Sequence, residues 1–123
     1  MNTPDIISEL FANEVIVVGT NLAGRHVGGL AREAALKWGL LEGCAEGLVG
    51  KCYGFPTLHS DLGKIHIEVL QEQADAFFSC ARANPENVFL LTKVGCGIAG
   101  FTEVEIAPLF KNAPPNVIKP LGW

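Results

Sequence analysis

Continuous apolar runs along the chain alternate with segments whose apolar residues recur at helical spacing. A strand is expected at residues 14–19, because the run at 15–18 is apolar and β-branched throughout, which is typical of a strand buried on both faces. A second buried strand is expected at 87–93, and a short strand at 52–55 is expected to end at Pro56 because proline cannot extend a ladder. Residues 117–120 are expected to form an edge strand.

The helical segments have apolar residues at intervals of three or four positions. They cover residues 27–38, 68–84 and 103–110, and a shorter piece of the same kind lies within 1–13. Residues 40–51 show no period and are rich in glycine. Strands that alternate with helices favour parallel pairing through right-handed crossovers. We therefore expect one α/β domain over residues 1–123, with a mostly parallel central sheet.

Composition and charge restrict the classes of function. With 49% hydrophobic residues, 18% charged residues and a net charge of -4, the chain is typical of a packed globular protein and lacks the basic face that nucleic acids require. No apolar run is long enough to span a membrane. The four cysteines form no C-x-x-C pair, which favours reduced thiols in the cytoplasm over a disulfide framework. We expect no membrane association, no metal site and no cofactor.

Two glycine-rich turns carry the strongest functional signal, at residues 19–29 and 94–101. Each follows a predicted strand and precedes a predicted helix, an arrangement in which bare backbone approaches a ligand and helix N–H groups face an anion. Ligands of parallel sheets bind beyond the carboxyl ends of the strands, so the two turns are expected to face one cleft. Neither turn has the spacing of a Rossmann or P-loop motif, and a purely structural role for the glycines stays open.

Polar residues among these glycines suggest individual roles. Asn21 follows a strand and is suited to a ribose hydroxyl, and Arg25 can bind a phosphate with two parallel hydrogen bonds. His26 is a candidate base, and Cys96 is either a nucleophile or a small apolar residue in a tight turn. The predicted catalytic residues are Asn21 and His26. The predicted ligand-binding residues are Gly19, Asn21, Arg25, Gly28, Gly29, Gly95, Cys96, Gly97, Ile98, Ala99, Gly100 and Phe101.

Three stretches of the chain together resemble a known family. V-V-G-T-N-L-A-G-R-H-V-G-G-L-A, E-G-L-V-G-K-C-Y-G-F-P-T and L-L-T-K-V-G-C-G-I-A-G-F with I-A-P-L-F resemble small bacterial and phage proteins typified by G-S-N-L-A-G-R-H-G-A-G-A-A. That pattern is similar to the macro domain, a three-layer α/β/α fold that binds ADP-ribose. The resemblance implies that Asn21 contacts the distal ribose, that residues 27–30 form the diphosphate loop and that 94–101 form the second phosphate loop. Hydrolytic macro domains carry an aspartate after the glycine-rich loop, where this chain has Leu30 nearby.

These observations lead to one expectation and two alternatives. We expect a small-molecule partner, a nucleotide diphosphate-sugar such as ADP-ribose, bound between the two glycine-rich turns. The first alternative is a hydrolase that acts on an ADP-ribosyl bond or a related phosphoester, with His26 as base or with water oriented by Asn21. The second is a protein-interaction module without catalysis, in which the glycines serve only the fold.

Overall fold

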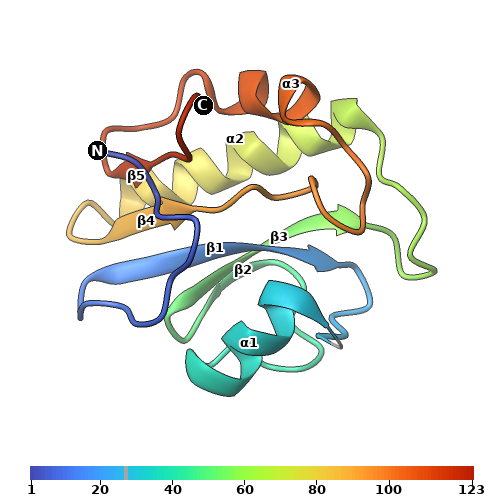
Figure 1. Cartoon of the computed structure of the whole chain (residues 1–123), viewed down its shortest axis with the longest axis horizontal. Coiled ribbons are helices and arrows are strands. Elements are labelled where there is room, and N and C mark those ends of the chain that lie inside the picture. The colour runs from blue at the N-terminus through green and yellow to red at the C-terminus, as the bar shows by residue number, and fades with distance from the viewer. Residues whose placement is uncertain (27) are drawn as a thin grey trace.

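A five-stranded sheet organises the computed structural model, which describes residues 1–26 and 28–123 (Figure 1). The strand order is β2-β3-β1-β4-β5. Strand β1 pairs in parallel with β3 and β4, β4 pairs in parallel with β5, and β2 pairs antiparallel with β3. The strands are β1 Glu14–Asn21, β2 Gly47–Val49, β3 Cys52–Leu58, β4 Val88–Leu91 and β5 Val117–Ile118.

Helices cover both faces of the sheet (Figure 1). Helix α1, Gly29–Lys37, lies on one face and α2, Ile67–Ala83, lies on the other. The short helix α3, Glu103–Ile106, continues directly into the 3₁₀ helix η1, Ala107–Phe110, beside α2. Among the described residues, no helix has both the length and the apolar character that crossing a membrane requires.

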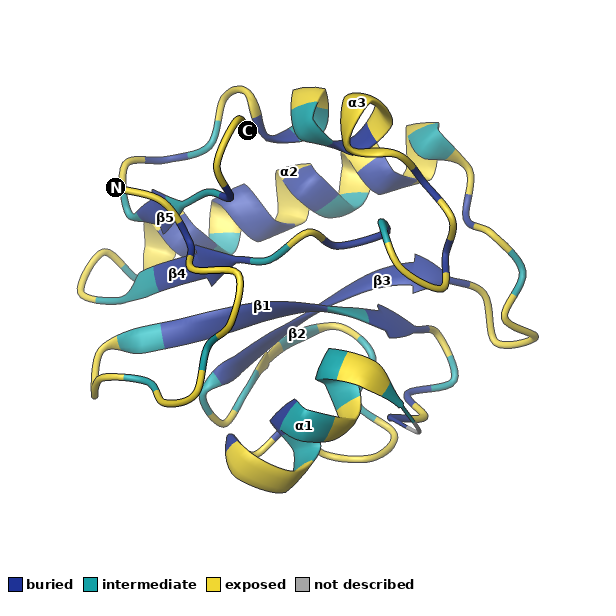
Figure 2. Ribbon diagram, viewed as in Figure 1, coloured by how far each residue is buried: buried dark blue, intermediate teal, exposed yellow. Residues whose placement is uncertain are grey.

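Strand β1 contributes to a separate apolar core on each face of the sheet. Val15 and Val17 pack with α2, whereas Ile16 and Val18 pack with α1. This alternation follows from the two-residue period of a strand. Because all four side chains are apolar, β1 can lie between two helical layers with neither face exposed to water (Figure 2).

The larger core, on the α2 face, centres on Phe77. Its ring is fully buried and lies 4.9 Å from the Tyr53 ring and 5.6 Å from the Phe89 ring, centroid to centroid. Phe110 of η1 lies 6.4 Å from the same ring. Residues from α2, β3, β4 and η1 therefore meet in one aromatic cluster, and Trp123 at the chain end packs against its edge.

The α/β class is confirmed, but the expectation of a mostly parallel sheet requires correction. The sheet is mixed, because the glycine-rich segment 40–51 contains the antiparallel strand β2. Strand β3 does not end at Pro56 and instead continues to Leu58. Beyond Gly54, strand β3 has no β2 partner. No hydrogen bond to β2 therefore requires the N–H that Pro56 lacks.

The helix expected within residues 1–13 is absent from this part of the described chain. Thr3 instead forms a parallel bridge with Pro120 and extends the sheet edge. Ile7 and Leu10 pack against the α1-side core, whereas Phe11 is 78% exposed. The apolar residues of this segment are thus divided between core and solvent, and Thr3 holds the segment at the sheet edge. The predicted start of α1 at Val27 falls outside the described residues.

Replacing Phe77 by alanine should lower the free energy of unfolding by about 3–5 kcal/mol, because it removes a fully buried ring and leaves a cavity. The milder Phe77→Leu variant should cost about 1 kcal/mol and keep the protein folded. Exposed Phe11 is the matched control, and Phe11→Ala should change the free energy by less than about 0.5 kcal/mol. Urea unfolding followed by circular dichroism checks all three values, and equal costs at positions 77 and 11 would contradict the assigned core.

Candidate functional site

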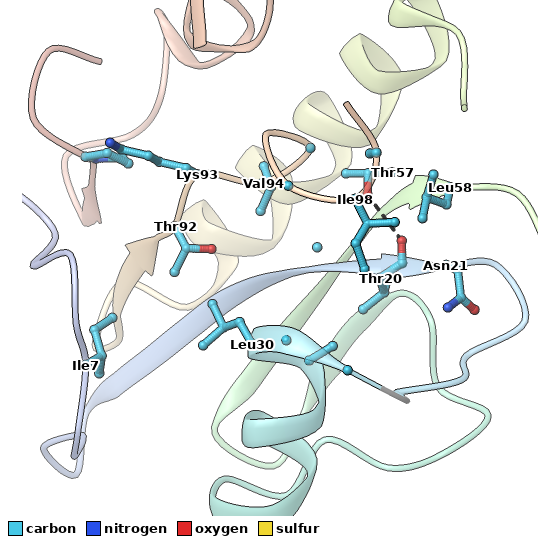
Figure 3. Close-up of a pocket in the computed structure, with 18 of the residues that line it drawn as sticks. Ile7, Thr20, Asn21, Leu30, Thr57, Leu58, Thr92, Lys93, Val94 and Ile98 are labelled. Carbon is cyan, nitrogen blue, oxygen red and sulfur yellow. Dashed lines mark hydrogen bonds between the residues drawn. The ribbon is translucent and has the colours of Figure 1, made fainter. Parts of the chain in front are cut away.

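A cavity of about 460 Å³ opens at the carboxyl ends of the parallel strands (Figure 3). Each of these strands contributes residues to the cavity wall from its last few positions or from just beyond its end, as parallel sheets commonly do. The residues are Gly19, Thr20 and Asn21 from β1, Thr57 and Leu58 from β3, Thr92, Lys93 and Val94 after β4, and Pro120 after β5. The volume lies within the range of pockets that hold small molecules.

The two glycine-rich turns both line this cavity, as the sequence predicted. From the first turn come Gly28 and Gly29 with Leu30 and Ala31 of the first helical turn of α1. From the second come Gly95, Gly97, Ile98 and Ala99. Figure 3 shows Leu30 and Ile98 on facing sides of the cavity, which places the start of α1 opposite the second turn.

Backbone N–H groups are the main donors that these turns offer. Helix α1 has Gly28 as its N-cap and no side chain caps its first N–H groups. In the second turn, Gly100 donates to Gly97 and Phe101 donates to Gly95. Within the described residues, the N–H groups of Gly97, Ile98 and Ala99 donate to no protein acceptor. Two sets of backbone donors therefore border the same space.

Arg25 and Lys93 are the two cationic residues among the described lining residues, and they differ in whether a carboxylate pairs with them. The Arg25 side chain is exposed, and no ion pair is formed by its guanidinium within residues 1–26 and 28–123. The Lys93 ammonium lies 3.4 Å from the Glu103 carboxylate, and Figure 3 shows its side chain directed away from the cavity. Of the two, Arg25 is therefore the cation that is not paired with a carboxylate among the described residues.

Asn21 uses its amide to close the first glycine-rich turn. Its Nδ2 donates to the Arg25 carbonyl at 2.8 Å, and its Oδ1 accepts from the Arg25 N–H at 3.1 Å. Each end of the amide retains one further donor or acceptor position, so contact with a ribose hydroxyl is still geometrically compatible. The predicted ribose contact stays a prediction.

His26 does not line the cavity, although the sequence suggested it as a base. Its side chain is 3% exposed, and the ring Nε2 donates to the Leu41 carbonyl at 2.8 Å. The backbone N–H of His26 donates to the Glu42 carboxylate at 2.9 Å. Both interactions tie His26 to the segment that follows α1, so the imidazole is buried outside the cavity wall.

Three further predicted residues, Cys96, Gly100 and Phe101, also lie outside the cavity wall. Phe101 is buried beneath Gly95, whose φ of +80° excludes most other residues and whose added Cβ would lie 3.3 Å from the Phe101 ring. Burial raises the pKa of the Cys96 thiol, and the nearby Glu103 carboxylate raises it further. These three residues belong to the second turn but do not form its cavity-facing surface.

The N-terminal segment supplies a wall that sequence reasoning missed. Thr3, Pro4, Asp5 and Ile7 line the cavity, and Ile7 lies across it from Asn21 (Figure 3). The segment is held at Thr3, whose N–H donates to the Lys119 carbonyl at 2.9 Å. No periodic pattern marks these residues, because their position depends on pairing with the other end of the chain.

Two threonines at strand ends, Thr20 and Thr92, were also missed. Thr20, Thr57 and Thr92 line the cavity, and their hydroxyls donate to the carbonyls of Ala45, Thr20 and Val17 respectively. Their position directly at the predicted carboxyl ends was a usable signal. In the part of the chain that the structure describes, no group of three His, Cys, Asp or Glu residues is placed to hold a metal ion.

Comparison with known proteins identifies the fold but no function. No protein-family model matches the chain, and no curated protein matches it. Among solved structures, the chain is similar to a protein of unknown function from Bacteroides thetaiotaomicron, with a TM-score of 0.63 and 16% sequence identity. The match covers 93% of this chain and 91% of the other. The same arrangement of helices and strands therefore occurs in a second protein with very different side chains.

The raised pKa of Cys96 predicts an unreactive thiol near neutral pH, because burial favours the protonated form. Alkylation of Cys96 by iodoacetamide, followed by mass spectrometry, should be slow at neutral pH and should accelerate only at alkaline pH. Cys52, whose pKa burial raises to about 11, should react more slowly still in the folded protein. Rapid modification of Cys96 at neutral pH would restore it as a candidate nucleophile.

Proposed function

We propose that this protein binds a nucleotide diphosphate-sugar, ADP-ribose or a close relative, in the cavity between its two glycine-rich turns. The observation that carries the proposal is the convergence of two sets of backbone N–H donors, from the start of α1 and from residues 97–99, on one cavity. Backbone N–H groups at a helix start and in a glycine-rich turn are suited to phosphate oxygens. Two such groups that border one cavity favour a diphosphate over a single phosphate.

The remaining wall suits the other parts of such a ligand. Apolar side chains of Ile7, Leu30 and Ile98 can contact the faces of a ribose or a base. The Asp5 carboxylate can only accept hydrogen bonds, so it fits an amino or hydroxyl group of the ligand and opposes a phosphate. Arg25 supplies positive charge for the diphosphate. The resemblance to macro domains, with their three-layer fold, supports the same ligand class.

Binding without catalysis is favoured over hydrolysis by the composition of the wall. Among the described lining residues, Asp5 is the single carboxylate and none is a histidine. A hydrolase needs a base within hydrogen-bond reach of the attacking water, and His26 is committed to Leu41 outside the cavity. We place the protein in the cytoplasm, where its four free cysteines would stay reduced.

Gly28 offers a direct test of the proposed site. Its φ of -162° is accessible to any residue, and a Cβ added there would meet no atom within 4 Å, so Gly28→Leu should fold normally. The leucine side chain would extend at the cavity wall and block the approach of a diphosphate to the start of α1. Calorimetric titration with ADP-ribose, with AMP and ribose-5-phosphate alongside, should show binding of ADP-ribose by the wild type and none by the variant.

Ala76→Leu, on the exposed side of α2 and remote from the cavity, is the matched control and should bind as the wild type does. Equal affinity of Gly28→Leu and wild type would place the ligand elsewhere. Absence of ADP-ribose binding by the wild type itself would refute the proposed ligand.

Arg25→Ala should weaken ADP-ribose binding by about tenfold or more, because it removes the free cation at the cavity wall. It should also reduce the dependence of the dissociation constant on salt concentration. Arg32→Ala removes an exposed arginine of α1 that does not line the cavity, and it should have a much smaller effect. Titrations at two salt concentrations distinguish the two arginines, and identical behaviour would exclude a specific contact by Arg25.

A further inference from the structure

Residues 41–44, which follow α1, form three hydrogen bonds with the first glycine-rich turn, two to its backbone and one to the His26 side chain. The His26 N–H donates to Glu42 Oε1 at 2.9 Å, and the His26 ring donates to the Leu41 carbonyl at 2.8 Å. The Gly43 N–H donates to the Gly24 carbonyl, also at 2.9 Å. The turn is thus fastened to a segment that does not itself line the cavity.

The two segments approach so closely that one position accepts only glycine. Gly24 has a φ of +69°, and a Cβ added there would lie 2.5 Å from the carbonyl carbon of Gly43. No side chain fits in that space without moving backbone. The contact between the turn and residues 41–44 is therefore made directly by main chain, and their relative position is closely defined.

Arg25 lies between these fixed points. The Asn21 amide holds both its N–H and its carbonyl, and the next residue, His26, is held by Glu42 and Leu41. The Arg25 guanidinium, in contrast, forms no hydrogen bond or ion pair with any described residue. A restrained backbone thus carries a side chain that is free to bind a ligand.

We propose that Glu42 is a positioning residue, which holds the turn so that Arg25 and the start of α1 face the anionic part of the ligand. This inference rests on the proposed function for its ligand, but the fastening of the turn can be measured without any ligand. Glu42 acts through the His26 N–H and contacts no ligand itself, because it lies outside the cavity wall. His26 serves the same purpose through its ring.

The charge of Glu42 allows a positional role to be distinguished from an electrostatic one. A carboxylate near a site for anions repels the ligand, so loss of its charge alone should strengthen binding. Loss of its hydrogen bond should instead weaken binding, because the turn is released. Glu42→Gln removes the charge and keeps an oxygen acceptor, whereas Glu42→Ala removes both.

The experiment compares wild type, Glu42→Ala, Glu42→Gln and the control Glu46→Ala, which removes an exposed carboxylate four residues further along the chain. Dissociation constants are measured by calorimetry with ADP-ribose and with inorganic pyrophosphate. We expect Glu42→Ala to weaken binding of both probes by about tenfold, and Glu42→Gln and Glu46→Ala to bind at least as well as wild type. Exchange of the His26 amide hydrogen, followed by NMR without ligand, should accelerate in Glu42→Ala and stay slow in Glu42→Gln.

Coupling to Arg25 supplies the second readout. In an Arg25→Ala background, Glu42→Ala should weaken binding by less than it does in the wild type, because part of its effect acts through the Arg25 side chain. Fully additive effects would overturn the assignment to Arg25.

Unchanged His26 exchange in Glu42→Ala, or tighter binding by that variant, would overturn the positional role. If the wild type binds neither probe, the proposed function fails, and the exchange measurement alone decides whether Glu42 fastens the turn.

Discussion

The burial of β1 between two apolar layers is the interaction on which the rest of the structure depends. Val15 and Val17 enter the α2-side core, and Ile16 and Val18 enter the α1-side core. Each such side chain contributes about 1.5–3 kcal/mol when it is fully removed from water. Because β1 also pairs with β3 and β4, this one strand joins both helical layers to the sheet and fixes where its carboxyl end lies.

The candidate site follows from that placement and is made largely of backbone. The carboxyl ends of β1, β3 and β4 point to one edge, where the chain must turn before it enters α1, the loop before α2 and the second glycine-rich turn. Turns with glycine expose N–H groups that no side chain covers. A site of this kind recognises negative charge through many weak dipoles, so few of its residues need a distinctive side chain.

Specific side chains do matter for holding the first glycine-rich turn in place. The side chains of Asn21, Glu42 and His26 form hydrogen bonds with the backbone of residues 25, 26 and 41 respectively. A loop that is held in its binding conformation before the ligand arrives loses less entropy on binding. Asn21 and His26, which the sequence assigned to the ligand, thus form hydrogen bonds that hold the turn, and the Arg25 side chain between them is exposed.

The sequence by itself determined the α/β class, the two buried strands, helices α1 and α2 and the meeting of two glycine-rich turns at one cavity. These features depend on local periodicity and on the rule that parallel strands end at the same edge. Only the tertiary structure decided the antiparallel strand β2, the continuation of β3 through Pro56 and the cavity wall formed by Thr3 to Ile7. It also decided that the His26 ring bonds to the Leu41 carbonyl and does not line the cavity. The N-terminal wall depends on pairing with the other end of the chain, and the His26 contact depends on Leu41, and no local pattern encodes either partner. Strand β2 pairs with the neighbouring β3, but its three residues are too few to show a period.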